Sequence, residues 1–258
     1  MSMVPVTVRT GRPLAPMQRT LWMSQRRHPD APLQNMAHLS HIEGQIDADR
    51  LASAFASVVV ASDALRTRIV EEDGEPRVHL DAAIVESDVL DIALADAFAW
   101  AQQRASQAID TSHRGYDSVV LRHDDGSVSW YLALHHTVTD ATSHALVFAA
   151  TAEAYNGGSP VLDSYYEWAR AAGDATDPRT ERAIDHWAGR PAAPGIGRLY
   201  QPVGRPQPAA SRIDVPLPHR LRAQLDARLG AEYTMLTDEL AWTTLLTTAA
   251  ALYIHRVA

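Results

Sequence analysis

The chain contains no cysteine among its 258 residues. Disulfide bonds, thiolate zinc sites and cysteine nucleophiles are therefore excluded, and nothing points to an oxidising compartment. The sequence also lacks Lys- and Arg-rich runs, and its formal net charge is −8. Because binding to a phosphate backbone needs a basic surface, this charge argues against a nucleic-acid-binding protein.

Long apolar segments are missing as well. The N-terminal segment, residues 1–13, lacks the apolar core of a signal peptide. Apolar runs such as residues 145–152 are too short and too interrupted to cross a bilayer. We therefore expect a cytoplasmic protein with no membrane partner. Hydrophobic residues make up 46% and charged residues 21%, which is ordinary for a globular protein.

Apolar periodicity predicts strands and helices in mixed order. We expect a hairpin over residues 65–80 and strands at 4–9, 36–43, 118–122, 128–134 and 211–216. We expect helices at residues 16–26, 47–62, 90–108, 141–155, 218–229 and 236–256. The pattern predicts an α/β (α+β) fold in which helices flank a mixed sheet. Trp168, Trp187 and Trp242 occupy helical positions and are expected to be core anchors.

The chain is expected to divide into three parts. Residues 1–172 form an N-terminal lobe, and residues 173–210 form an extended crossover that is rich in Pro and Gly. Residues 211–258 begin a second, incomplete lobe. Because one strand and two helices cannot bury their own apolar faces well, this last part is expected to need further chain around it.

The clearest chemical pattern is LALHHTVTDATS, residues 132–143. An apolar strand ends at two adjacent histidines, and because side chains alternate across a strand, His135 and His136 are expected to point in opposite directions. Asp140 starts the next helix, where its carboxylate can accept hydrogen bonds from free N–H groups. Histidine titrates near neutrality, so an exposed His136 is a candidate general base.

Two other interpretations of this pattern remain open. Both rings can be satisfied core or rim histidines, with Asp140 serving only as a helix cap. Metal ligation by His135, His136 and Asp140 is weaker, because adjacent strand histidines diverge and no third ligand has suitable spacing. We therefore expect no metal. The isolated histidines, among them His113 and His144, are expected at the surface or at a rim.

The segment HHTVTDA resembles the HHxxxDG motif of the condensation domains of nonribosomal peptide synthetases and of their acyltransferase relatives. Four further segments resemble motifs of that family in the same order: LAPMQRTLW at 14–22, ALRTRI at 64–69, SYYEWAR at 164–170 and AIDHWAGRP at 183–191. One such motif is modest evidence, whereas five in family order are specific. The resemblance implies the N-terminal half of a condensation domain, a chloramphenicol-acetyltransferase-like lobe followed by the start of a second lobe.

The resemblance also implies roles for single residues. His136 is the catalytic candidate, which positions or deprotonates the acceptor amine or stabilises the tetrahedral transition state. His135 points away and supports the loop. Asp140 is a structural residue, and the family pattern pairs it with Arg66 in a salt bridge.

The sequence departs from the family pattern in three places. Ala141 replaces the motif's glycine and adds a methyl group where the acceptor's chain must pass. Ala141 and Ser143 are candidates for lining the pocket, although Ser143 can equally be a plain first-turn residue of the helix. Residues 61–63 read Ala-Ser-Asp where Arg-His-Glu is usual. Family members also resemble two similar lobes with a tunnel between them, whereas this chain is expected to hold only the beginning of the second.

The expected function is condensation-type acyl transfer in nonribosomal peptide biosynthesis. The resemblance implies that an amine, or a hydroxyl, attacks a carrier-protein-bound acyl or peptidyl thioester directly and gives an amide or an ester. No cofactor is expected to bind directly, because phosphopantetheine arrives on the carrier protein. The alternative is a non-catalytic, truncated module that docks a carrier protein or a partner domain.

The expected partners are an acyl or peptidyl carrier protein and a second lobe. That lobe is either a separate chain, a second copy of this one, or a segment that has been separated from this chain. Large exposed apolar patches usually mark interfaces. Leu245, Leu246 and Leu252 are therefore expected to be partly covered by a partner.

Overall fold

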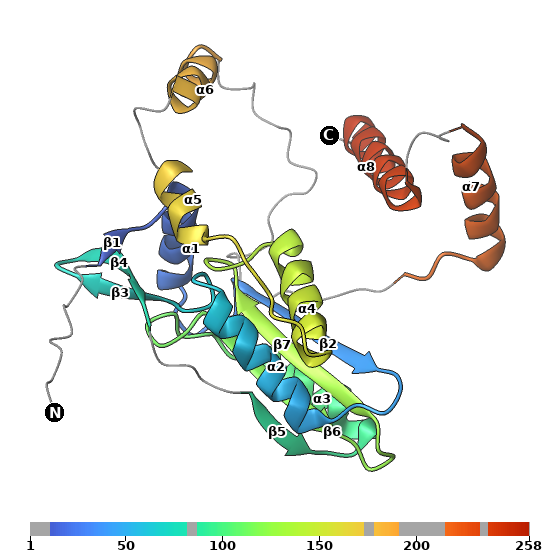
Figure 1. Ribbon diagram of the computed structural model, residues 1–258. Coiled ribbons are helices and arrows are strands. Elements are labelled where there is room, and N and C mark those ends of the chain that lie inside the picture. The colour runs from blue at the N-terminus through green and yellow to red at the C-terminus, as the bar shows by residue number, and fades with distance from the viewer. Residues whose placement is uncertain (1–10, 82–86, 173–177, 191–214, 233–236, 258) are drawn as a thin grey trace, which may run out of the picture. The chain divides into compact units, whose positions relative to one another are not determined.

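A computed structural model shows the architecture of the chain (Figure 1). It describes residues 11–81, 87–172, 178–190, 215–232 and 237–257. The chain divides into two compact units, residues 1–185 and 186–258. The lobe boundaries expected from the sequence fall beside or within ranges that are not described, so they stay a prediction.

The first unit is built on a four-stranded sheet. Its order is β2 (Asn35–Ile42), β7 (Val128–His135), β6 (Tyr116–Arg122) and β5 (Asp88–Asp91). The β2–β7 and β7–β6 pairs are antiparallel, and the β6–β5 pair is parallel. The mixed sheet flanked by helices that the sequence predicts is therefore confirmed.

Strand β7 lies at the centre of the core, and every one of its residues is buried. Its side chains alternate between the two faces of the sheet. Trp130, Leu132 and Leu134 enter one apolar cluster, whereas Tyr131 and Ala133 enter the cluster on the opposite face. A strand that is covered on both faces reads as a continuous apolar run, which is the pattern that the sequence shows before the two histidines.

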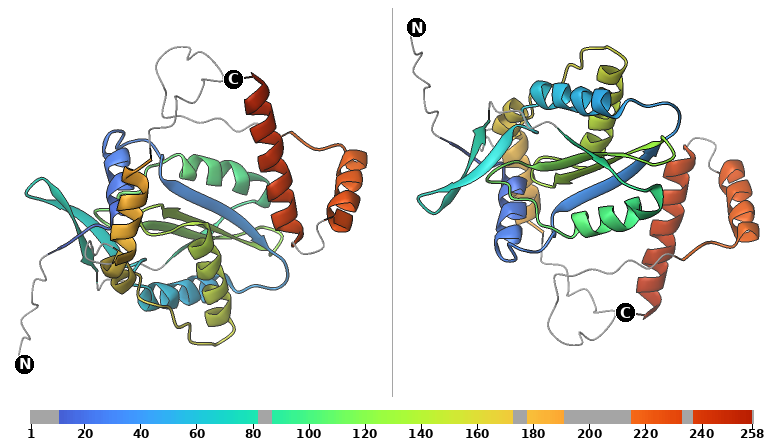
Figure 2. Two further views of the ribbon diagram at one scale, coloured as in Figure 1. Left: turned by 90° about the horizontal axis from the view of Figure 1, so that it is seen from above. Right: turned by 90° about the horizontal axis from the view of Figure 1, so that it is seen from below.

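Helices cover both faces of this sheet. Figure 2 shows α2 (Ala48–Ala61) and α4 (Ala141–Tyr155) on one face and α3 (Leu94–Ala105) on the other. On the first face, Phe55 and Val58 of α2 are fully buried beside Val147 of α4. On the second face, Ala97 and Ala101 of α3 pack against the sheet. The apolar stripes of these helices therefore form two separate cores.

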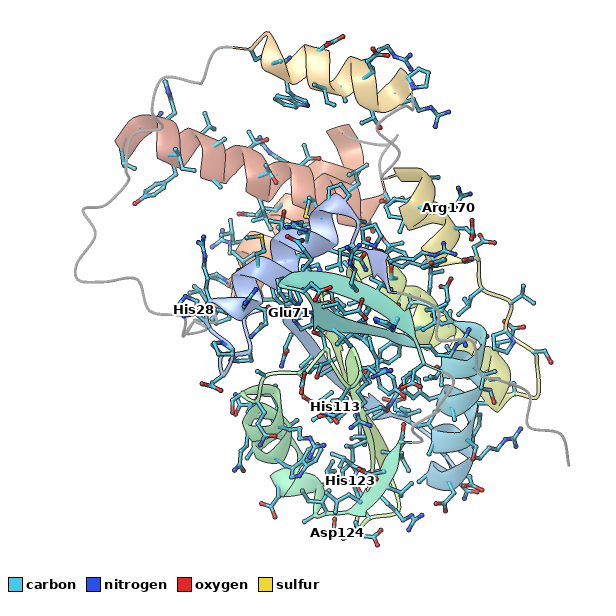
Figure 3. The ribbon with its side chains drawn as sticks, turned by 90° about the vertical axis from the view of Figure 1, so that its left-hand side faces the viewer. His28, Glu71, His113, His123, Asp124 and Arg170 are labelled. Atoms are coloured by element: carbon cyan, nitrogen blue, oxygen red, sulfur yellow. The ribbon has the colours of Figure 1, made fainter. Side chains whose placement is uncertain are left out.

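A smaller sheet stands beside the main one, in the order β1 (Arg12–Pro13), β4 (Glu75–Leu80) and β3 (Thr67–Glu72). The β3–β4 hairpin turns at Asp73 and Gly74, with φ angles of 50° and 81°. This left-handed region favours Gly and tolerates Asp, so the predicted turn is confirmed. Helix α1 (Pro16–Arg26) lies beside the hairpin, where Arg26 Nη2 is 3.1 Å from Glu71 Oε1. Figure 3 shows Glu71 on the hairpin next to α1.

The helix predicted over residues 90–108 is wrong at its beginning. Leu90 lies in β5, parallel to β6, and α3 begins at Leu94. A four-residue edge strand is too short to show a clear alternation, and its pairing depends on a contact with β6 that is distant in sequence. The strand predicted at residues 4–9 and most of the strand predicted at 211–216 lie outside the described residues.

Helix α5 (Tyr165–Ala172) begins beside the end of α2. The Asp63 carboxylate accepts the backbone N–H groups of Tyr165 and Tyr166 at 3.0 and 3.1 Å. Trp168 on α5 is 61% exposed, and Trp187 on α6 (Pro178–Ala188) is 66% exposed. The prediction that these two tryptophans are core anchors is therefore wrong, because a helical position alone does not determine which neighbour covers it.

The second unit contains α7 (His219–Glu232) and α8 (Asp238–Val257). Trp242 Nε1 donates a hydrogen bond to Asp226 Oδ1 at 2.9 Å, and Leu229 and Ala241 are buried. The two helices match the predicted ranges 218–229 and 236–256 closely. Across the described parts of the chain, no helix combines the length and apolarity that a membrane span requires.

Candidate functional site

The loop that joins β7 to α4 is held from three sides. The His135 N–H donates to Gly115 O at 2.8 Å, and the His136 N–H donates to Gln34 O at 2.8 Å. From α1, Gln18 Nε2 donates to Thr137 O at 2.9 Å. The loop therefore has a defined shape before any ligand binds.

Gly115 allows the segment before β6 to lie close to Val138 of this loop. A Cβ atom at Gly115 would lie 2.8 Å from both γ-methyl carbons of Val138. Real Cβ atoms do not come so near a neighbouring carbon, so any side chain here would push Val138 and the histidine loop outward. The glycine thus serves packing rather than an unusual backbone angle.

His135 is buried and neutral. Its ring is 1% exposed, and its Nδ1 accepts the backbone N–H of Thr137 at 3.2 Å. The proton of the ring is therefore on Nε2, which is buried and has no hydrogen-bond partner among the described residues. Burial, with a smaller contribution from His136, lowers the pKa of His135 to about 4.

His136 is half-buried and has the opposite tautomer. Its Nδ1 lies 2.9 Å from Thr139 O. Because a carbonyl oxygen can only accept, Nδ1–H is the donor, and the neutral ring keeps its lone pair on Nε2. This arrangement fixes the orientation of the ring and leaves one nitrogen able to take a proton. The two histidines therefore differ in burial and in tautomer, whereas their predicted opposite directions stay a prediction.

Asp140 caps α4. Its Oδ1 accepts the Ser143 N–H at 2.7 Å. The pKa of Asp140 is lowered first by this backbone hydrogen bond, next by the Ser143 side chain, and less by the charge of His136. The carboxylate is therefore ionised at neutral pH, four residues after the catalytic candidate along the chain.

The predicted salt bridge between Asp140 and Arg66 is not formed. Asp140 instead accepts a hydrogen bond from the Ser143 N–H, and within the described residues no ion pair includes Arg66. Arg66 lies just before β3 and lines a pocket together with Arg68 and Arg114. The sequence pattern identifies both residues but not their geometry, since a pairing across 74 positions depends on side-chain rotamers.

Ala141 and Ser143 both lie in the first turn of α4, and Ala141 is exposed. Ser143 contributes its backbone N–H to the Asp140 cap. Their role in lining a substrate channel stays a prediction. No group of three or more His, Asp or Glu side chains that suits a metal ion occurs in the described part of the chain.

His144, one residue further along α4, is buried rather than at a rim. It is 4% exposed, and its ring centroid is 4.1 Å from that of His38 on β2. Neither ring nitrogen has a hydrogen-bond partner among the described residues. Burial, with a smaller contribution from His38, lowers the pKa of His144 to about 4. The surface expectation fails because the first turn of α4 places this ring against the sheet.

Gln18 is the site residue that sequence reasoning did not single out for a role. It is 4% exposed, its Oε1 accepts the Ala15 N–H at 3.1 Å, and its Nε2 donates a hydrogen bond to Thr137 O. A polar side chain three residues after a helix start can turn back to the first N–H groups of the helix. The position was visible within LAPMQRTLW, but the contact with a loop 119 positions away was not.

A family model described as the condensation domain matches residues 8–257. The chain belongs to the condensation-domain family. It is similar to an isonitrile lipopeptide synthase of Streptomyces coeruleorubidus, with 29% identity over 216 residues that cover 74% of this chain and 14% of that protein. It is also similar to the phosphinothricin tripeptide synthetase PhsC of Streptomyces viridochromogenes, with 26% identity over 279 residues that cover 95% of this chain and 24% of that protein.

Solved condensation domains share the fold. The starter condensation domain of rhizomide synthetase RzmA matches with a TM-score of 0.62 and 21% identity, covering 69% of this chain and 47% of that one. The first condensation domain of the calcium-dependent antibiotic synthetase matches with a TM-score of 0.58 and 20% identity, covering 70% and 47%. This condensation-domain chain therefore aligns with about half the length of those domains.

Proposed function

We propose that this chain supplies the histidine of a condensation-type acyl transfer in nonribosomal peptide biosynthesis. The substrates would be an acyl or peptidyl thioester on the phosphopantetheine of a carrier protein and an amine acceptor. The single observation that carries the proposal is the state of His136, whose Nδ1–H is held by Thr139 O while Nε2 keeps its lone pair. Membership of the condensation-domain family supports the reaction class.

The proposed chemistry is direct attack on the thioester. The acceptor nitrogen forms a C–N bond with the thioester carbonyl carbon, and Nε2 of His136 takes the proton that the nitrogen loses. The C–S bond then breaks, and the proton passes from His136 to the departing thiolate. General-base help of this kind is typically worth roughly 10²–10⁴-fold in rate. A hydroxyl acceptor would follow the same steps and give an ester.

We further propose that a second lobe completes the site. The chain aligns with about half of each solved condensation domain, and orienting two substrates requires groups on both sides of them. Leu246 and Leu252 on α8 are 57% and 58% exposed, which leaves apolar surface for further chain to cover. The covering chain would be a separate lobe, a second copy, or a segment that has been separated from this chain.

The alternative is a non-catalytic module that docks a carrier protein or a partner domain. The half-length alignment favours this alternative, because half a channel excludes water poorly. Docking would not require the tautomer of His136 to be fixed. The two proposals therefore differ in what they predict for a change at this one ring.

The test is amide formation by the full chain with an acyl-loaded carrier protein and an amine. The catalytic proposal expects product from the wild type and at least about a hundredfold slower product from His136→Ala. His28→Ala is the matched control, since His28 is exposed on the short segment after α1. Equal rates from the His136→Ala and wild-type chains would disprove the catalytic role. Carrier-protein binding with no product from any chain would favour the docking module.

A further inference from the structure

Three arginines converge on a pocket that the proposed reaction does not use. Arg66 comes just before β3, Arg68 lies within it, and Arg114 comes from the segment that precedes β6. Asp81, just after β4, is the one carboxylate among the lining residues of this pocket. His113 lies at the same place, which Figure 3 shows below the β3–β4 hairpin.

The charges around this arginine pocket do not cancel. Asp81 Oδ2 lies 3.1 Å from Arg68 Nε and forms an ion pair with it. Arg114 Nη2 lies 3.8 Å from Asp117 Oδ1, a long separation. The Asp117 carboxylate already accepts two hydrogen bonds from Arg104, at 2.7 and 3.0 Å.

Arg66 differs from the other two arginines of the pocket in its partners. The Nε atoms of Arg66 and Arg68 are both buried and lack a hydrogen-bond partner among the described residues. Arg68, however, is ion-paired with Asp81, whereas no ion pair among the described residues includes Arg66. A buried guanidinium N–H that lacks an acceptor is unfavourable, because it has lost water and gained nothing. An acceptor supplied from outside would therefore be stabilising.

The apolar lining and the small volume of the pocket favour a compact group. Val59 and Leu65 from the end of α2 and the following turn supply apolar surface, with Tyr116 beside them. The cavity volume is about 20 Å³. This is room for a water molecule or one terminal oxygen-bearing group, and not for a sugar or a base.

We infer that the arginine pocket binds a small oxyanion, with the Arg66 guanidinium as its main donor. The shared chemistry is a carboxylate or phosphate group whose oxygens accept the paired N–H groups of arginine. The net charge of −8 would repel anions at long range, so binding depends on the local excess of guanidinium groups. The site is separate from His136 and goes beyond the proposed acyl transfer.

The test is a titration of inorganic phosphate into the full chain, followed by calorimetry. The wild type is expected to show saturable binding of one phosphate per chain, and Arg66→Gln is expected to weaken it roughly tenfold or more. Arg27→Gln, at an exposed arginine after α1, is the matched control and should bind as the wild type does. Acetate as a competitor distinguishes the two sources. Displacement by acetate assigns a carboxylate, and failure to displace assigns a phosphate.

A second variant keeps the inference testable if Arg66→Gln does not fold. Asp81→Asn removes the carboxylate that competes for the arginines, so phosphate should bind several-fold more tightly. His136→Ala should bind phosphate with unchanged affinity, so this result does not depend on whether the acyl-transfer proposal holds. The inference is overturned if phosphate and acetate both fail to saturate the wild type, or if Arg66→Gln and the wild type bind phosphate equally.

Discussion

At the scale of single residues, the two adjacent histidines differ because their Nδ1 atoms meet opposite backbone groups. Nδ1 of His135 accepts an N–H from Thr137, whereas Nδ1 of His136 donates to the carbonyl of Thr139. The proton is consequently on Nε2 in the first ring and on Nδ1 in the second. Only the second ring is both partly exposed and supplied with a lone pair on Nε2, which is why one histidine suits proton transfer and the other suits packing.

The buried histidines predict a loss of stability in acid. The folded pKa of His144, about 4, lies below the ordinary histidine value of 6.5. The unfolded chain therefore binds a proton that the folded chain does not, so this contribution is present above pH 6.5 and is lost as pH falls toward 4. His144→Leu should reduce the pH dependence by up to about 1.4 kcal/mol per pH unit in this window. Urea unfolding at several pH values measures it, and parallel curves for both chains would contradict it.

The Asp140 cap predicts a graded response to substitution. Asp140→Ala removes the acceptor of the Ser143 N–H and should cost about 1 kcal/mol of unfolding free energy, whereas Asp140→Asn can still cap and should cost less. If the carboxylate instead formed an ion pair with Arg66, Asp140→Asn would cost about as much as Asp140→Ala, because both remove the charge. Urea unfolding at neutral pH separates the two cases, with Asp96→Asn in the first turn of α3 as the control.

At the scale of elements, the histidine loop depends on α1, which lies far from it in sequence. Gln18 joins the first turn of α1 to Thr137 through one buried side chain. Asp63 similarly joins the end of α2 to the start of α5. Both contacts satisfy free backbone groups at element ends, so they hold the elements in place more than they add apolar packing.

Gln18→Ala is expected to loosen the histidine loop. Loss of the buried hydrogen bonds should cost about 1–3 kcal/mol, because Thr137 O and the Ala15 N–H both lose their partner. Hydrogen exchange should become faster at the backbone N–H groups of residues 135–140. Gln103→Ala, at an exposed position of α3, is the control. Unchanged exchange in this loop would show that Gln34 and Gly115 hold it without α1.

At the scale of the whole molecule, apolar surface is unevenly distributed. The first unit buries its central strand completely, whereas α8 of the second unit carries several large exposed apolar side chains. Among them are Leu246 at 57% and Tyr253 at 52% exposure. Exposed apolar surface of this kind often marks an interface, so α8 is where the second lobe proposed above is expected to bind.

Association is expected to depend on α8. Leu245 is half-buried and Leu246 exposed, and changing both to Glu should abolish self-association or binding of a second lobe by burying charge at the contact. Light scattering coupled to size-exclusion chromatography gives the absolute mass. Val161→Glu, at a residue of the first unit that is 92% exposed, is the control. Association that is unchanged by the Leu245 and Leu246 substitutions would disprove this surface as the contact.

The sequence by itself determined the elements whose cause is local. The strand β7, the helices α2 and α4, and the β3–β4 hairpin follow from side-chain period and backbone preference, and all were predicted. The family was likewise predicted from the sequence, because the order of its motifs along the chain can be recognised without knowledge of the contacts. The opposite directions that alternation predicts for His135 and His136 stay a prediction.

Tertiary structure decided what depends on contacts between distant segments. The strand β5 forms by pairing with β6, the burial of His144 comes from packing against β2, and the Gln18 contact crosses 119 positions. The position of Arg66, in a pocket with two other arginines rather than beside Asp140, was decided in the same way. Local sequence cannot encode these outcomes, because each depends on which of several competing partners the fold brings within hydrogen-bonding distance.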